Sequence, residues 1–366
     1  MYLTAALLLL VTLTPGYALC KVLDASADRL RKIALSPALG LLLAYGLAGL
    51  LLLSDLWTWK LMSALLLLLN VVSLAHIRHR PLEGKSLTSW QKLERAMHGE
   101  VYGNPEESIS DEVVAQRWLQ NQRKPWMLVL ASGIIASCLT LPMLQEIPFG
   151  IDWIGFSTLT NQIATVGNLS LPGTNDGFWT YTPAFPSLAA WIQGTLDISP
   201  ATAVFHLGHY SLFVLVLGIG GAMDRHGAGA HGILAMGLGA GLFAKVFDSG
   251  YPSVASQLGL VVGLLVLLRP TSTRGRHHTT GFILAFFSVL LIHPTGAIYL
   301  GALMLAHILI GLSLNETYGA NIKKLLFTSL ILLTIAGAIA LLILAPRMLD
   351  AAVFAEYGWQ GGRPML

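Results

Sequence analysis

Runs of about 20 apolar residues recur from one end of the chain to the other, and they limit its fold more than any other feature. An α-helix needs roughly 20 residues to cross the ~30 Å hydrocarbon core of a bilayer. Within that core every backbone N–H and C=O must be paired inside the protein, which a helix does by itself. Hydrophobic residues make up 54% of the 366 residues and charged residues 11%. Ordinary soluble domains carry about 25% charged residues. We therefore predict an all-α polytopic membrane protein.

The apolar runs predict about ten transmembrane helices. The first run begins without the basic residues of a signal peptide, so we interpret it as a membrane helix whose end is bent by Pro15 and Gly16. Cys20 and Cys138 lie in or beside apolar runs, which indicates neither a disulfide framework nor a metal site. The predicted spans are residues 1–19, 33–53, 56–76, 126–145, 201–222, 229–246, 252–268, 280–293, 296–313 and 325–345.

Lys and Arg are concentrated in alternate loops between the spans, and this predicts the orientation. Loops rich in Lys and Arg stay on the cytoplasmic side of a membrane. Eight such residues lie between residues 78 and 124, whereas none lies between Lys124 and Arg225. The rule therefore puts the segment from Glu146 to about Pro200 on the external side, with both chain termini. The further cytoplasmic basic residues are Lys21, Arg29, Arg31, Lys32, Arg225, Arg269, Arg274, Arg276, Lys323 and Lys324.

This topology divides the chain into three parts. Residues 1–77 form an N-terminal three-helix membrane unit, and residues 78–124 form a cytoplasmic loop with short helices. Residues 125–366 form a membrane core with an external loop at 146–200. The net charge of +3 is no sign of nucleic-acid binding, because what matters is where the charges fall along the chain. We expect membrane lipids as partners and no nucleic acid.

The external loop is predicted to contain two short helices. Residues 151–166 place Ile151, Ile154, Leu159, Ile163 and Val166 on one side and Asp152, Phe156 and Thr160 on another. A helix of this length with one apolar face is expected to lie along the membrane interface. After a turn-rich link, Pro183 and Pro186 favour an extended entry into a second helix that ends before Asp197. Loops of about 50 residues with such structure usually carry function.

Asp152 has two interpretations that the loop alone leaves open. An acid in the first turn of a helix stabilises it by typically 0.3–1 kcal/mol through the unpaired N–H groups and the helix dipole. Alternatively, a carboxylate at the membrane surface accepts a proton in a reaction.

Several segments follow one another in a characteristic order. An N-terminal helix ending in LLVTLTPGYAL and a basic turn are followed by IALSPALGLLL. Next come a cytoplasmic loop, a span with Glu146 and Asp152 at its external end, and YTPAFPSLAAWI. FDSGYPSVASQLGLVVGLL and FILAFFSVLLIHPTGAIYLGALMLAH occur later. In this order and in its topology the chain resembles the polytopic GT-C glycosyltransferases, most of all their archaeal and bacterial members, over roughly residues 125–345.

The resemblance implies a reaction and a place for it. GT-C enzymes move a sugar from a dolichyl- or polyprenyl-phosphate-type lipid donor on the external face, and an acidic residue of their first external loop takes part. Asp152 is at that position, with Glu146 as its near neighbour. The acids of the family often lie one residue apart, whereas these lie six apart. No metal site is predicted, and a divalent cation is the one cofactor left open.

The same resemblance suggests substrate-binding residues. Tyr181 and Phe185 would line the acceptor or sugar site, and Lys245 and His293 would contact the donor phosphate. Asp248, three residues after Lys245, belongs to this group and is also placed to pair with that lysine on one helical turn. His293 has an alternative role, which is to satisfy backbone groups freed by Pro294.

Our hypothesis is a multi-pass glycosyltransferase of a prokaryotic plasma membrane, with a lipid-linked sugar as donor and other glycosyltransferases as candidate partners. A transporter or lipid flippase is the first alternative, although such proteins usually place ionisable residues in mid-membrane and the acids here cluster at span ends. The second alternative is a non-catalytic GT-C-like scaffold, because no C-terminal soluble domain follows the tenth span.

Overall fold

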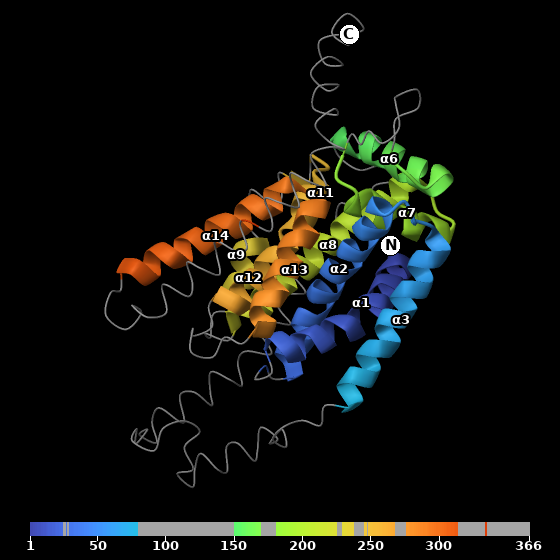
Figure 1. The fold of residues 1–366 in the computed structure, drawn as a ribbon. Helices are drawn as coiled ribbons and strands as arrows, with labels where there is room; N and C mark the ends of the chain where they lie inside the picture. The colour runs from blue at the N-terminus through green and yellow to red at the C-terminus, as the bar shows by residue number, and fades with distance from the viewer. Residues whose placement is uncertain are drawn as a thin grey trace, which may run out of the picture.

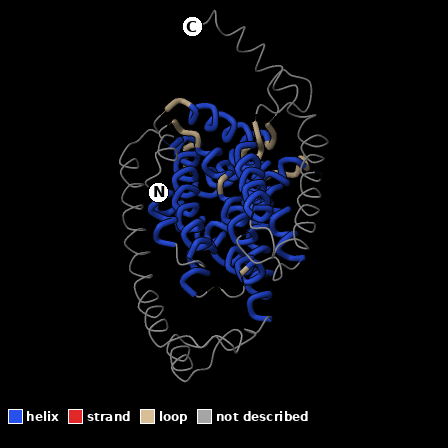
Figure 2. Tube along the Cα trace, turned by 90° about the vertical axis from the view of Figure 1, so that its left-hand side faces the viewer, coloured by secondary structure: helices blue, strands red, loops and turns tan. Residues whose placement is uncertain are grey.

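In the computed structural model, the parts of the chain that can be described are built from helices joined by turns, with no strand among them (Figures 1 and 2). The described residues are 1–24, 27, 29–79, 150–169, 181–224, 229–237, 245–246, 248–267, 276–313 and 334. The prediction of an all-α protein is confirmed for these residues. The predicted spans 126–145 and 325–345 and most of the cytoplasmic loop at 78–124 lie outside them.

Within the described parts of the chain, four helices are long and apolar enough to cross a membrane: α1 (Tyr2–Leu23), α2 (Arg29–Leu53), α3 (Trp59–His79) and α8 (Pro200–Met223). They match four of the predicted spans, so the chain is a membrane protein. The shorter described helices are α6 (Asp152–Val166), α7 (Ala184–Leu196), α9 (Gly229–Gly237), α11 (Tyr251–Ser256), α12 (Leu258–Leu267) and α13 (Arg276–Ile292), and α14 (Pro294–Ser313) has 20 residues.

Two details of the helices differ from the prediction. Helix α1 continues to Leu23, four residues beyond the predicted end at residue 19, and Pro15 is accommodated inside it. The span predicted at 252–268 is interrupted at Gln257, which caps α11 before α12 begins at Leu258. Ser256 and Gln257 are two adjacent polar residues within an otherwise largely apolar run, so hydropathy averaged over the whole span did not reveal this break.

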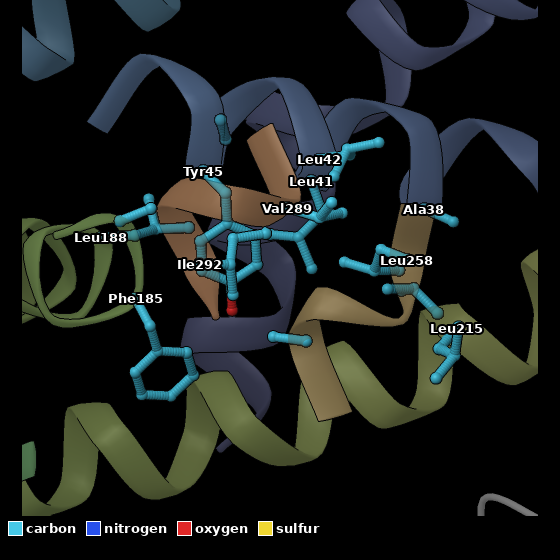
Figure 3. Packing of buried hydrophobic residues seen from close by; sticks show 14 of the residues in the cluster. Ala38, Leu41, Leu42, Tyr45, Phe185, Leu188, Leu215, Leu258, Val289 and Ile292 are labelled. Atoms are coloured by element: carbon cyan, nitrogen blue, oxygen red, sulfur yellow. The ribbon is translucent and has the colours of Figure 1, made fainter. Parts of the chain in front are cut away.

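Helix α2 lies at the centre of the described bundle and contacts α1, α7, α8, α12 and α13. Figure 3 shows Ala38, Leu41, Leu42 and Tyr45 of this helix among apolar side chains of α7, α8, α12 and α13. The buried Tyr45 hydroxyl lies 2.7 Å from Oγ of Ser211 on α8, which satisfies both polar groups inside the apolar core. The core of the described residues is therefore built around one membrane-length helix.

Helices α1 and α2 cross at a point where only glycine fits. A Cβ atom on Gly16 would lie 1.8 Å from the carbonyl oxygen of Ser36, and one on Gly40 would lie 1.9 Å from that of Thr12. Thr12 with Gly16, and Ser36 with Gly40, form two small-xxx-small pairs that let the backbones approach closely. The role of Gly16 is thus close packing of two helices.

We expect Gly16→Ala to lower the free energy of unfolding by about 1–3 kcal/mol, because the methyl group forces α1 and α2 apart. Gly301→Ala on α14 is the matched control, since no atom lies within 4 Å of the place where its Cβ would be. That substitution is expected to be neutral or slightly stabilising. Unfolding in detergent micelles measures both. Equal stability of the two variants would show that the crossing does not depend on Gly16.

The short helices α6 and α7 lie at one end of the bundle (Figure 1). Helix α6 runs across this end and packs on α7 and α8. Helix α7 ends at Leu196 with Asp197 in the left-handed conformation (φ 51°), as the predicted boundary requires. Its residues from Ala184 to Ile192 are all buried, so α7 is inserted among α2, α3, α6, α8 and α13 and does not lie on the surface. Small and apolar residues without a charge make this insertion favourable.

Candidate functional site

Helix α6 starts at Asp152 and buries a mixed face against the protein, on which Ile163 lies and not on the exposed apolar side where it was predicted. Phe156, Ser157, Thr160 and Ile163 are buried, whereas Ile151 is 75% exposed and Ile154 and Val166 are also exposed. These exposed apolar residues, at the end of a bundle of membrane-length helices, are what an interfacial helix presents to lipid. The face that carries Asp152 and Phe156 is directed toward the bundle and the cavity beside it.

The carboxylate of Asp152 makes no hydrogen bond to any described residue, and it is exposed. The N-cap position of α6 is Ile151, which has no side-chain oxygen, so no cap hydrogen bond forms there. Gly150 precedes it with φ +74°, and its Cα packs against the backbone of Asp248. The tight turn before α6 is therefore made by glycine and backbone packing, and the acid is not needed to form it.

A cavity of about 790 Å³ lies beside Asp152, and four separate parts of the chain line it. Asp152, Tyr181, Lys245 and His293 all contribute to its wall, although 141 residues separate the first from the last. The described residues that line it are Ile151, Asp152, Gly155, Phe156, Thr158, Leu159, Tyr181, Lys245, Gly250, Ser253, Gln257, His293, Thr295 and Tyr299. A concave site with a few converging polar groups is the usual form of a ligand site.

One part of the cavity carries the acid and a phenol. Burial, and then the negative charge of Asp152, raise the pKa of Tyr181 well above its ordinary value. The hydroxyl of Tyr181 therefore keeps its proton at neutral pH and is a hydrogen-bond donor. Its ring meets that of Phe156 edge-on, with centroids 5.1 Å apart, which fixes the phenol against α6.

Another part of the cavity carries a cation and a neutral imidazole. Burial, and then the positive charge of Lys245, lower the pKa of His293 to about 4, so this ring in the turn between α13 and α14 is uncharged at neutral pH. The Lys245 side chain is exposed and forms no ion pair with any described residue. In particular it is not paired with Asp248, which is exposed and does not line the cavity.

Phe185, another predicted site residue, is not in the cavity wall. The Phe185 ring is fully buried, with centroids 6.0 Å from Phe156 and 6.1 Å from Tyr45, so it supports the wall from behind. In Figure 3 it lies beside Tyr45, in the core. Glu146, the other predicted catalytic residue, lies outside the described residues.

The structure adds lining residues that sequence reasoning did not single out. Ser253 and Gln257 come from α11, and Thr295 and Tyr299 come from the first turns of α14. The available signal was their position at predicted external span ends, next to Gly250-Tyr-Pro and His293-Pro. Among the described residues no group of three or more His, Cys, Asp and Glu side chains is placed to hold a metal ion.

Comparison of the chain with protein-family models, with curated proteins and with solved structures finds no match. The chemistry that this cavity can support therefore follows from the residues that line it. It offers one carboxylate without a hydrogen bond, one ammonium without a described ion-pair partner and two neutral donors. All lie at the end of the bundle opposite to Lys21, Arg31 and Lys32, since α1 ends and α2 begins at that other end.

Proposed function

We propose that this protein is a membrane glycosyltransferase that moves a sugar from a polyprenyl-phosphate-linked donor to an acceptor hydroxyl on the external face. The observation that carries the proposal is the cavity shared by Asp152, Tyr181, Lys245 and His293. A reaction of this kind needs a base for the acceptor and donors for the departing phosphate, and the two kinds of group lie in one wall. The finer fold assignment, a GT-C-like arrangement of about ten spans in a prokaryotic plasma membrane, is part of the same proposal.

In the proposed reaction, the acceptor oxygen attacks the anomeric carbon of the sugar. A bond forms between that oxygen and that carbon, and the bond from the carbon to the phosphate oxygen breaks, so the electron pair leaves with the lipid phosphate. Asp152 takes the proton of the attacking hydroxyl. Lys245 and His293 donate to the phosphate oxygens, and the Tyr181 hydroxyl donates to a sugar or acceptor oxygen.

The surroundings of the cavity suit a donor with a lipid chain. Ile151 and Tyr299 line the cavity and are 75% and 47% exposed, and Ile298 on α14 is exposed beside them. Apolar surface of this kind at a membrane boundary accepts an acyl or prenyl chain, while the polar wall accepts the headgroup. A water-soluble sugar donor would not need exposed apolar residues at the edge of its binding site.

Gene deletion followed by complementation tests the proposal. Deletion is expected to remove a sugar from surface glycans or glycolipids, as read by mass spectrometry, and the wild-type gene is expected to restore it. Lys245→Met is expected to weaken donor use by about 10- to 100-fold, because one charge-assisted hydrogen bond to the phosphate is lost. Lys60→Met is the matched control, since Lys60 begins α3 at the same end of the bundle and does not line the cavity.

Three other outcomes count against this reading. Equal donor use by the Lys245→Met and Lys60→Met variants would remove Lys245 from the site. Normal glycans after deletion, together with lost transport of a solute or lipid, would favour the transporter or flippase. A missing sugar that the Lys245→Met and Asp152→Asn variants both restore, with a second glycosyltransferase bound to the protein, would favour the scaffold.

A further inference from the structure

His293 stands between two helices and uses one ring nitrogen to begin the second of them. It follows Ile292, the last residue of α13, and precedes Pro294, the first residue of α14. Its Nδ1 accepts a hydrogen bond from the main-chain N–H of Thr295, with 3.2 Å between the two nitrogens. This is the bond by which an N-cap side chain satisfies the second N–H of a helix. His293 therefore caps α14.

This bond determines which ring nitrogen carries the proton. A main-chain N–H can only donate, so Nδ1 must offer its lone pair and has no hydrogen. A neutral imidazole has one N–H and one acceptor nitrogen, which places the proton on Nε2. The Thr295 hydroxyl lies 2.6 Å from the same Nδ1 and shares its lone pair in a three-centre arrangement. A proton on Nδ1 would find an acceptor in the Thr295 hydroxyl oxygen but would abolish the main-chain bond from the N–H of Thr295, and with it the cap of α14.

The remaining nitrogen is free for the cavity. His293 and Thr295 both line it, together with Lys245, and Nε2 has no hydrogen-bond partner among the described residues. The ring is held from one side by Tyr181, with centroids 5.8 Å apart. The cavity thus has two hydrogen-bond donors side by side, the Lys245 ammonium and the Nε2–H of His293. His293 offers no acceptor to a ligand, because its Nδ1 is used by Thr295. A ligand group with a proton to donate finds no partner in this pair.

We infer that Thr295 is a positioning residue, which holds Nδ1 of His293 and thereby fixes the ring as an Nε2–H donor to an anionic oxygen of the ligand. Capping and ligand binding, which looked like alternatives for His293 in the sequence, are then performed by different nitrogens of one ring. The identification of that oxygen as a phosphate oxygen rests on the proposed function. The assignment of the tautomer does not, because it follows from the contacts to Thr295 alone.

Nitrogen-15 NMR of the full chain, labelled at histidine, tests the tautomer directly. The two ring nitrogens have well-separated shifts when one is protonated, and the spectrum of His293→Gln identifies the His293 signals among those of 11 histidines. We expect Nε2–H in the wild type and in Thr295→Ser. In Thr295→Val we expect a mixed population, because only the longer main-chain bond of 3.2 Å then remains to hold the Nδ1 lone pair. An Nδ1–H ring in the wild type would overturn the inference even if the valine variant fails to fold. If a folded Thr295→Val variant keeps the ring entirely as Nε2–H, then the Thr295 hydroxyl does not position His293.

Binding of farnesyl phosphate tests the donor role, with inorganic phosphate as the second probe. Gln at position 293 places an amide N–H near the position of Nε2, whereas Asn places one near Nδ1. We therefore expect His293→Asn to bind farnesyl phosphate on the order of 10-fold or more weakly than His293→Gln, and inorganic phosphate to bind more weakly than farnesyl phosphate. Equal binding by the two variants would refute the donor role. An Nε2–H ring without binding of either probe would refute the phosphate and the proposed function, while the tautomer assignment would stand.

Discussion

Asp152→Asn is expected to lower the rate of sugar transfer by about 10²–10⁴-fold, which is the range for loss of a general base. Asparagine has nearly the same shape and cannot accept the proton. Because no described residue forms a hydrogen bond with the Asp152 carboxylate, the exchange removes no contact in the described structure. The expected change in stability is limited to the helix-dipole contribution, up to about 1 kcal/mol. A large loss of rate at nearly constant stability would assign the acid to chemistry.

Initial rates in isolated membranes with a polyprenyl-phosphate-linked sugar measure the loss of transfer rate in Asp152→Asn. Unfolding in detergent measures its change in stability. Asp197→Asn is the matched control. Asp197 is an exposed acid just after α7, it does not line the cavity, and asparagine tolerates its left-handed conformation (φ 51°). If Asp152→Asn transfers sugar as fast as Asp197→Asn and loses only stability, then Asp152 merely begins a helix and the base lies elsewhere.

Hydropathy was sufficient to predict the long helices, because about 20 apolar residues in a bilayer have one favourable conformation. The C-terminal ends of α6 and α7 agree with the prediction, and Gly167 and Asp197 take left-handed conformations there. The expected extended entry into α7 was wrong, because Pro183 has helical backbone angles at the N-cap and Pro186 lies inside the first turn. Burial was not predictable. The sequence of α7 fits a surface helix and an inserted helix equally well, and only the contacts with α2 and α13 distinguish them.

The same difference applies to the site. The residue types of Asp152, Lys245 and His293 are read from the local sequence, and their predicted external side comes from the distribution of basic residues. Their presence around one cavity depends on how α6, α11 and α14 pack, which a single sequence does not report. Phe185 illustrates the consequence, because an aromatic residue four positions after Tyr181 was expected beside it and points instead into the core. The position of the proton on His293 depends on a hydrogen bond from Thr295. The dipeptide His-Pro indicates a helix start at this place but does not predict that bond.

The opposite end of the bundle contains a buried ion pair that sequence analysis counted only as cytoplasmic charge. The Arg31 guanidinium bonds to the Asp24 carboxylate, and both side chains are almost fully buried. Nε of Arg31 also donates to the carbonyl oxygen of Gly221, 3.1 Å away, in the last turn of α8. His278 on α13 bonds to the carbonyl oxygen of Leu23 close by. The pair thus joins the turn between α1 and α2 to the ends of two other helices.

Breaking this pair is expected to be among the most damaging changes to the fold. Asp24→Leu leaves the Arg31 charge buried without its carboxylate, and we expect a loss of about 3–5 kcal/mol in the free energy of unfolding. The double variant Asp24→Leu with Arg31→Met removes both charges and is expected to recover most of that loss, because the desolvation cost disappears together with the attraction. Lys60→Met, which removes an exposed charge, is the control and is expected to stay within about 0.5 kcal/mol of the wild type.

Denaturant unfolding in detergent micelles measures these four proteins together with the single variant Arg31→Met, which completes the double-mutant cycle that isolates the interaction of the two residues. A double variant as unstable as Asp24→Leu would mean that the Arg31 bond to Gly221, and not the ion pair, holds the three helix ends together. A single variant as stable as Lys60→Met would mean that water reaches the pair and screens its charges. In either case the cavity at the far end should keep its ligand affinity in every folded variant, because none of these residues lines it.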